Sequence, residues 1–400
     1  MFVEVKQSNH AATRLHHLAE IMRIHRAGEG ADYPVLDWLQ TNPMSGPALI
    51  FDIGRIEQRM QWLKQIAGPL SIGTMLSVKS CADPQYLDAG NKYLDGFDIS
   101  NPAEYASLPD NLEGKLVSIA SPDLSFDLSS FVTKGNDAVF VLDSQAQLDR
   151  YFSQDTHIPY LLRVQGASLL SDTDPAYYEK TRFGFTIEEV KHAFKQAQVL
   201  ANPPSGFHVH HGSERNAEST YRSMISGLET LARQMSFDPA FINLGGGLHG
   251  MNREEIGSVL TLARKAFTAP CSILVEPGRW YGNNSGYAIG TIVNQKTAGD
   301  TMEYVVNLSR GCHLKWSAVK LIYPMGFNPK KFQEVQFFGS SCYEGDSIGR
   351  FLLPYEDDFI QESGFLPGRQ VVFSGVNPYS AAWNTSFNGI PKAREVWWRE

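Results

Sequence analysis

The chain has 400 residues, of which 42% are hydrophobic and 20% are charged, and its formal net charge is −8. This length favours two domains, and the negative charge without a basic tract argues against nucleic acid and anionic membranes as partners. No run approaches the ~18 consecutive apolar residues of a membrane helix. The cysteines Cys81, Cys271, Cys312 and Cys342 lie far apart, which favours reduced thiols in a cytoplasmic protein.

The N-terminus lacks the apolar core of a signal peptide, and residues 11–30 have the spacing of a polar amphipathic helix. After this helix, apolar β-branched runs alternate with amphipathic stretches such as residues 55–68 and 187–200. Nine runs can be read: residues 47–53, 74–80, 96–101, 115–121, 137–143, 159–165, 206–212, 241–247 and 272–279. Repeated strand–helix units predict an α/β fold, and eight of them close into a (β/α)8 TIM barrel.

Past Arg279 the pattern changes to strands and turns without long helical spacers. These runs predict a mostly antiparallel β domain: residues 286–296, 302–308, 334–341 and 369–376. The ninth run, residues 47–53, is expected to pair with that sheet, outside the barrel. The predicted domains are the N-terminal helix and strand (1–56), the barrel (57–284) and the C-terminal β domain (285–400).

Polar residues stand at or just past the ends of six barrel runs. They are Lys79, Asp98, Arg163, His210, the glycines Gly245, Gly246 and Gly247, and Glu276. Each alone is most simply a surface or turn residue. Since the active site of such a barrel lies where its strands end, their coincidence on one rim predicts a functional site there.

The chemistry of three of these features is complementary. A partly buried lysine loses its charge easily, which a Schiff-base amine such as Lys79 requires. Glycines directly after a strand let backbone N–H groups approach an anion. With the carboxylate of Glu276, these are the parts needed to hold pyridoxal phosphate: an imine-forming amine, a phosphate cradle and a partner for the pyridine nitrogen.

The order of the motifs resembles that of the fold type III pyridoxal-phosphate decarboxylases, the ornithine, arginine and diaminopimelate decarboxylase family. After the lysine run come G-x-D at 96–98, H-x-G-S at 210–213, GGG at 245–247 and EPGR at 276–279. Two more follow, C-x-x-G-D at 342–346 and a tyrosine before F-N-G at 387–389. The resemblance extends from about residue 47 to residue 390 and implies a homodimer with shared active sites and pyridoxal 5'-phosphate as cofactor.

The resemblance also implies residue roles. Lys79 would form the Schiff base, His210 would stack on the pyridine ring, and Glu276 would face the ring nitrogen. Cys342 would reach across the dimer interface and protonate the carbon that has lost carbon dioxide. Further cofactor contacts are implied for Asp98, Arg163, Ser213, Gly245, Gly246, Gly247, Gly278, Arg279 and Tyr379. Alanine racemases share the fold but present an arginine to the ring nitrogen, so a carboxylate there favours decarboxylation over racemisation.

The sequence departs from the family pattern where the substrate's far end is expected. Relatives carry an acidic residue directly after the cysteine, which pairs with the distal ammonium group, and here that residue is Tyr343. An unpaired ammonium in a closed site would be costly. An acylated or otherwise modified diamino acid is therefore favoured, such as a citryl-diaminopropionate-like siderophore intermediate, with Tyr343, Arg310, His313 and Lys315 as candidate contacts.

Three alternatives stay open. One is an ornithine- or diaminopimelate-type decarboxylase that acts on the free amino acid. A second is a metal-dependent hydrolase on the same barrel, in which His208 and His210 form an H-x-H pair with Asp98, His249 and Glu276 as further ligands. A third is a non-catalytic relative that serves as a binding protein.

Overall fold

The computed structural model describes residues 34–154, 156–170, 181–210, 212, 217–299, 301–322, 332–354 and 366–400. The helix predicted for residues 11–30 lies outside the described residues. These described residues form two compact units: those within 55–282 make up one, and those of 34–54 together with those of 283–400 make up the other.

The first unit is a closed barrel of eight parallel strands, which pair in chain order until β9 returns to β2. The strands are β2 (Ile72–Ser77), β3 (Gly96–Ile99), β4 (Leu116–Ala120), β5 (Asp137–Leu142), β6 (Tyr160–Val164), β7 (Gly206–Val209), β8 (Phe241–Asn243) and β9 (Ser272–Val275). Each overlaps one of the eight predicted barrel runs, so the barrel prediction is confirmed. Most residues in these strands are buried, as expected for a parallel sheet covered on both faces.

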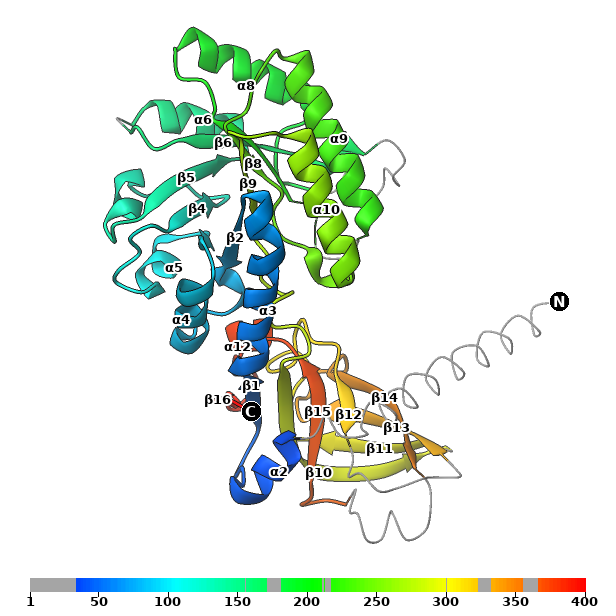
Figure 1. Ribbon diagram of the computed structural model, residues 1–400. Coiled ribbons are helices and arrows are strands. Elements are labelled where there is room, and N and C mark those ends of the chain that lie inside the picture. Colours follow the sequence, from blue (N-terminus) through cyan, green and yellow to red (C-terminus); the bar gives the residue numbers. More distant parts are fainter. Residues whose placement is uncertain are drawn as a thin grey trace, which may run out of the picture. The chain divides into compact units, whose positions relative to one another are not determined.

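Helices surround the barrel strands (Figure 1). The α-helices of this part of the chain are α3 (Ile53–Ala67), α4 (Pro84–Tyr93), α5 (Pro102–Ser107), α6 (Gln145–Phe152), α8 (Ile187–Val199), α9 (Glu218–Gln234) and α10 (Arg253–Ala266). The predicted stretches 55–68 and 187–200 correspond to α3 and α8. Helix α8 begins at a capping box between Thr186 and Glu189, which satisfies free N–H groups of its first turn. No helix in the described ranges has the length and apolar character needed to span a membrane.

The alternation of side chains on β7 decides which of its residues face the barrel interior. The ring of Phe207 packs edge-on against Phe237, with ring centroids 5.4 Å apart, and Phe237 in turn contacts Phe194 of α8. Phe207 therefore points outward to the helices. Because successive side chains of a strand point to opposite faces, the buried His208 points into the barrel.

The second unit is a mixed, mostly antiparallel sheet in the order β12-β15-β10-β11-β13-β14, with β1 paired to both β10 and β16. The strands are β1 (Ala48–Asp52), β10 (Gly286–Ala298), β11 (Thr301–Val306), β12 (Lys320–Ile322), β13 (Phe332–Gly339), β14 (Ser347–Pro354), β15 (Gln370–Val376) and β16 (Arg394–Trp398), and the helices are α2 (Pro34–Thr41) and α12 (Tyr379–Ala382). The N-terminal strand pairs with this sheet, as predicted. Strands β12, β14 and β16 are not among the predicted runs.

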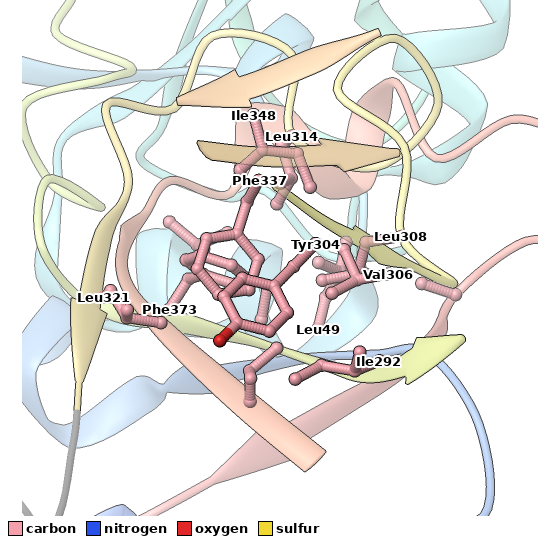
Figure 2. Close-up of a cluster of buried hydrophobic side chains, with 14 of the residues drawn as sticks. Leu49, Ile292, Tyr304, Val306, Leu308, Leu314, Leu321, Phe337, Ile348 and Phe373 are labelled. Carbon is pink, nitrogen blue, oxygen red and sulfur yellow. The ribbon is translucent and has the colours of Figure 1, made fainter. Parts of the chain in front are cut away.

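Figure 2 shows the apolar core of the β domain, where aromatic side chains from separate strands meet. Tyr304 of β11 and Phe337 of β13 stack with ring centroids 5.1 Å apart, and Phe373 of β15 meets Phe337 edge-on at 5.5 Å. Leu49 of β1 belongs to the same fully buried cluster. The N-terminal strand is therefore part of the core of this domain, because it buries apolar side chains there.

Gly206, the first residue of β7, provides a test of barrel packing. A Cβ at this position would lie 1.8 Å from the carbonyl oxygen of Phe241 on β8. Since the obstacle is backbone, we expect Gly206→Ala to lower the free energy of unfolding by ~2–4 kcal/mol, measured by urea denaturation. Gly257→Ala is the control, because a Cβ there meets nothing within 4 Å and alanine favours the helix by up to ~1 kcal/mol. Equal stabilities of the two variants would contradict this account.

Candidate active site

Buried polar side chains from several strands meet inside the barrel, toward the ends of the strands. They are Ser77, Asp98, Ser118, His208 and Asn243, joined by Glu276 directly after β9. Parallel strands end on the same face of a barrel, so residues distant in sequence gather there. Of the rim positions that the sequence singles out, Asp98 and Glu276 belong to this buried group.

Lys79 lies in η2 (Val78–Ser80), a single 3-10 turn after β2, and not on the strand itself. Its side chain is 47% exposed, so it is less buried than the apolar flanking residues suggested. Its Nζ lies 3.5 Å from Oδ2 of Asp98, which also accepts a hydrogen bond of 2.6 Å from Ser77 Oγ. The lysine amine is therefore oriented by a buried carboxylate.

Asp98 has an unusual protonation equilibrium. Burial raises its pKa to about 7, the negative charge of Glu276 adds to this rise, and Lys79 and Ser77 oppose it. Its Oδ1 is buried, and no described residue forms a hydrogen bond with it. At neutral pH this carboxyl group can therefore hold or release a proton near the amine of Lys79.

The pKa of Glu276, unlike that of Asp98, is lowered. Burial alone would raise its pKa, but hydrogen bonds and the nearby His208 outweigh that effect, so the pKa lies below its ordinary value. Asn243 Nδ2 donates to Oε1 at 2.5 Å, and His208 Nε2 lies 3.6 Å from Oε2. Ser118 contributes in the same direction. The barrel therefore contains an ionised carboxylate that is contacted at both oxygens.

The glycine loop after β8 lies against His210. Gly245 has φ +65°, and a Cβ on it would approach the carbonyl oxygen of Val209 to 2.7 Å, so this conformation favours glycine. Its N–H donates to Asn243 Oδ1 at 2.9 Å, and the Gly246 N–H donates to His210 Nδ1 at 3.1 Å. The backbone N–H groups of Gly245 and Gly246, which are expected to bind phosphate, thus donate hydrogen bonds to protein side chains.

The remaining predicted barrel residues surround this loop and the interior. Gly278 approaches η2 closely, because a Cβ there would lie 2.9 Å from Ser80 Cβ. Burial and the positive charge of Arg279 lower the pKa of His249, next to the glycine loop, to about 4. The guanidinium of Arg163 lies 4.6 Å from the ring centroid of Phe183 and interacts electrostatically with Asp98 and Glu276. Arg279 therefore places positive charge near the loop.

Cys342 and Tyr343 lie in the β domain, on the loop between β13 and β14. Cys342 is exposed, and Tyr343 is 66% exposed. The buried Asp346 closes this loop, because its carboxylate accepts hydrogen bonds from Ser341 Oγ and from the Arg310 N–H. The loop is thus held at its base while its two candidate functional side chains are open to solvent.

Two of the predicted substrate contacts, His313 and Arg310, form hydrogen bonds inside the β domain. His313 is fully buried, with Nδ1 accepting from the Ser309 N–H at 3.1 Å and Nε2 at 3.0 Å from the carbonyl oxygen of Pro391. The guanidinium of Arg310 donates to the carbonyl oxygens of Leu314 and Ser317. These contacts give both side chains structural roles, so we do not retain them as substrate contacts.

Tyr379 begins α12, and its ring lies 6.4 Å from that of Trp316. Ser213 lies outside the described residues. The described part of the chain groups no three His, Cys, Asp or Glu side chains in positions to share a metal ion. In the H-x-H pair, His208 Nε2 faces Glu276 while His210 Nδ1 accepts from Gly246, so this geometry does not support the metal-hydrolase alternative.

The barrel residues fit pyridoxal phosphate. A lysine amine, an ionised buried carboxylate, a glycine loop and an arginine occur on one barrel end. Three buried polar atoms of this interior cluster, Asp98 Oδ1, Ser118 Oγ and His208 Nδ1, have no hydrogen-bond partner among the described residues, and such atoms are usually satisfied by a ligand or water. Neither Asn243 nor the contact of His208 with Glu276 is predicted from the sequence, although the alternation of side chains along β7 identifies position 208 as facing inward.

Known proteins resemble this chain in sequence and in fold. The family model described as pyridoxal-dependent decarboxylase, pyridoxal binding domain, matches residues 53–283. A chloroplastic ornithine decarboxylase of Nicotiana glauca is 22% identical over 372 residues, or 86% of this chain and 82% of that protein. The arginine decarboxylase of Paramecium bursaria Chlorella virus has a TM-score of 0.76 at 18% identity, covering 92% of this chain and 100% of that one.

A third similar protein is the carboxynorspermidine decarboxylase of Campylobacter jejuni, solved with norspermidine. It has a TM-score of 0.67 at 17% identity, over 87% of this chain and 92% of that one. The family model covers more than half of the chain, including every barrel residue described above. The chain therefore belongs to the pyridoxal-dependent decarboxylases, and it is a pyridoxal-phosphate-dependent amino acid decarboxylase.

Proposed function

We propose that the enzyme decarboxylates an acylated or otherwise modified diamino acid, such as a citryl-diaminopropionate-like siderophore intermediate, and not free ornithine or lysine. The observation that carries this proposal is Tyr343. The family pattern places an acidic residue directly after the cysteine, where it pairs with a distal ammonium group. A phenol cannot neutralise that charge, whereas it can contact a neutral or acylated group.

An exposed lysine of the β domain supports an acidic acyl group. Lys315 is exposed, and its Nζ lies 3.7 Å from the ring centroid of Trp383, which is itself 41% exposed. A lysine positioned over an aromatic ring face and open to solvent is suited to pair with a carboxylate. The fold is also shared with a carboxynorspermidine decarboxylase, whose name indicates a substrate longer than a free diamino acid.

In the barrel, we propose that Lys79 carries the cofactor and that Glu276 faces its ring nitrogen. When bound, pyridoxal phosphate supplies an aldehyde that joins amines and a ring that withdraws electrons from the bond to the carboxylate. Arg279 supplies positive charge for the phosphate, together with the loop 245–247 and Gly278. His210, whose Nδ1 accepts from the Gly246 N–H, would stack on the cofactor ring beside this loop.

Further cofactor contacts stay as proposals: Asp98, Arg163, Ser213 and Tyr379. Asp98 is placed to exchange a proton with Lys79, because their side chains are 3.5 Å apart and the pKa of Asp98 is raised by burial to about 7. Arg163 balances the two interior carboxylates. We assign Tyr379 to the phosphate from its place in the family pattern.

We also propose that the enzyme is a homodimer in which Cys342 acts in the site of the partner subunit. The exposed position of this thiol on a loop closed by Asp346 supports a role outside its own domain. There its Sγ–H would deliver a proton to the carbon that has lost carbon dioxide. Each site would then need Lys79 from one subunit and Cys342 from the other.

One observation favours the alternative of a free diamino acid as substrate. Glu344 follows Tyr343 and is exposed, so a carboxylate stands one position later than in the family pattern. If it replaced the missing acid, it would pair with a distal ammonium group. Two measurements distinguish the two functions: which substrate, modified or free diamino acid, is decarboxylated faster, and whether removal of the Glu344 carboxylate lowers activity on the free diamino acid.

Carbon dioxide release over paired substrates tests the proposal. We expect kcat/KM on an N-acylated diaminopropionate bearing a carboxylate to exceed that on free ornithine, lysine or diaminopimelate by about 100-fold or more, because a site lacking a partner for a polar group discriminates strongly. Lys315→Ala should reduce the acylated activity, and Glu344→Gln is the control. High activity on a free diamino acid, lost in Glu344→Gln, would establish the alternative.

A further inference from the structure

Both carboxylate oxygens of Glu276 are contacted by side chains of neighbouring strands. Asn243 Nδ2 donates to Oε1 at 2.5 Å, and Asn243 Oδ1 accepts from the Gly245 N–H at 2.9 Å, which fixes the orientation of the amide. His208 Nε2 lies 3.6 Å from Oε2, and the side chains of His208 and Glu276 are only 3% and 4% exposed. Both oxygens of the carboxylate are therefore contacted by protein side chains, and bulk water is excluded from the site.

The surroundings of His208 select one form of its ring. Burial lowers the pKa of His208, so the imidazole is neutral at neutral pH and carries one N–H. Attraction to the carboxylate requires that hydrogen on Nε2. Nδ1 is then an acceptor, and among the described residues it has no partner. The geometry thus favours the Nε2–H form, directed at Glu276.

We infer that His208 is a positioning residue for Glu276: its Nε2–H holds Oε2, while Asn243 holds Oε1, and together they keep the carboxylate ionised and oriented. The functional consequence rests on the proposed function, in which Glu276 faces the cofactor's ring nitrogen. An ionised carboxylate leaves the proton on that nitrogen, and the positive charge strengthens the electron withdrawal that decarboxylation needs.

Other charged groups act on this pair from the neighbouring elements. They are Asp98 on β3, Lys79 in η2 and Arg163 on β6. Asp98, with a pKa raised by burial to about 7, titrates near neutral pH itself. A substitution at position 208 changes none of these three groups. A comparison of two variants at this position therefore reports only on the contact between residue 208 and Glu276.

The test compares His208→Gln with His208→Asn. Glutamine can place an amide nitrogen where His208 has Nε2, whereas asparagine reaches only the position of Nδ1. In the holoenzyme we expect His208→Gln to keep kcat/KM within about fivefold of wild type and His208→Asn to lose about 10- to 100-fold. The acid limb of the pH–rate profile and the visible band of the bound cofactor should shift to higher pH in His208→Asn only.

The cofactor-free protein provides a readout that does not depend on the proposed function. When an N–H at position 208 faces Glu276, the pKa of Glu276 is lower in the folded than in the unfolded state. Its ionisation then stabilises the fold above the unfolded-state pKa, and this stabilisation is lost as the pH falls. Without the donor at position 208, the pKa of Glu276 in the folded state is higher, so its ionisation stabilises the fold less. The stability advantage of His208→Gln over His208→Asn should therefore increase between about pH 5 and about pH 8.

The role of His208 and the proposed function would be refuted by different results. Identical pH profiles and cofactor spectra of the two variants, with a stability difference that does not change with pH, would overturn the role of His208. A wild-type protein that binds no pyridoxal phosphate would instead refute the proposed function, and the cofactor-free stability series would still decide the contact with Glu276.

Discussion

Replacement of Lys79 by alanine is expected to lower kcat by about 10³-fold or more, equivalent to about 4 kcal/mol of transition-state stabilisation. The amine would no longer be available to join the cofactor covalently. The visible absorbance band of the lysine-bound cofactor should disappear, and borohydride reduction should no longer fix pyridoxal phosphate to the peptide that contains residue 79. Carbon dioxide release, absorbance and peptide mass spectrometry measure these effects.

Lys191→Ala is the matched control, because Lys191 lies on α8 and pairs with Glu188 at 2.8 Å, one turn away. An exposed pair of this kind contributes little to stability, so this variant should keep its activity, its absorbance band and the reduced adduct. Borohydride trapping of pyridoxal phosphate at another lysine, with full activity in Lys79→Ala, would refute the assignment of the cofactor lysine.

Mixing Lys79→Ala with Cys342→Ala is expected to restore about a quarter of the wild-type activity from two nearly inactive proteins. Random reassociation of a twofold symmetric dimer makes about half of the molecules hybrids. In a hybrid with shared sites, one site combines both defects and the other combines Lys79 of one subunit with Cys342 of its partner. Carbon dioxide release, measured before and after exchange of subunits, reports the recovery.

The control mixture is Lys79→Ala with Glu276→Ala. Both residues act from the same barrel, so every hybrid site retains one defect and the activity should stay at the level of the single variants. Size-exclusion chromatography must show that each variant assembles like wild type. Absence of recovery with Cys342→Ala, despite hybrid formation, would show that each chain contains its complete site.

The fold could be predicted from the sequence to a large extent, because side-chain periodicity follows from strand and helix geometry. Eight runs correspond to β2 to β9, and the ninth run corresponds to β1 of the β domain. The missed strands β12, β14 and β16 have weaker local signals. β16, for example, exists through its parallel pairing with β1, about 350 residues earlier in the chain.

Within the candidate site, the sequence identified residue types but not their contacts. His210 stood out through the H-x-G-S pattern, yet His208 is the residue that meets Glu276, at 3.6 Å. Lys79 was expected to owe its reactivity to burial, yet its side chain is 47% exposed and its nearby carboxylate is buried. His313 was a substrate candidate, yet both ring nitrogens are engaged inside the β domain.

The barrel, the separate β domain and the family could be recognised from the amino-acid sequence, because these depend on local periodicity and on short motifs in a fixed order. Which side chains meet, and which of them are ionised, depends on the folded chain. Two carboxylates illustrate this: burial raises the pKa of Asp98 to about 7, while contacts with His208, Ser118 and Asn243 lower that of Glu276. The balance between lost hydration and hydrogen bonding depends on the residues that the fold places around each group.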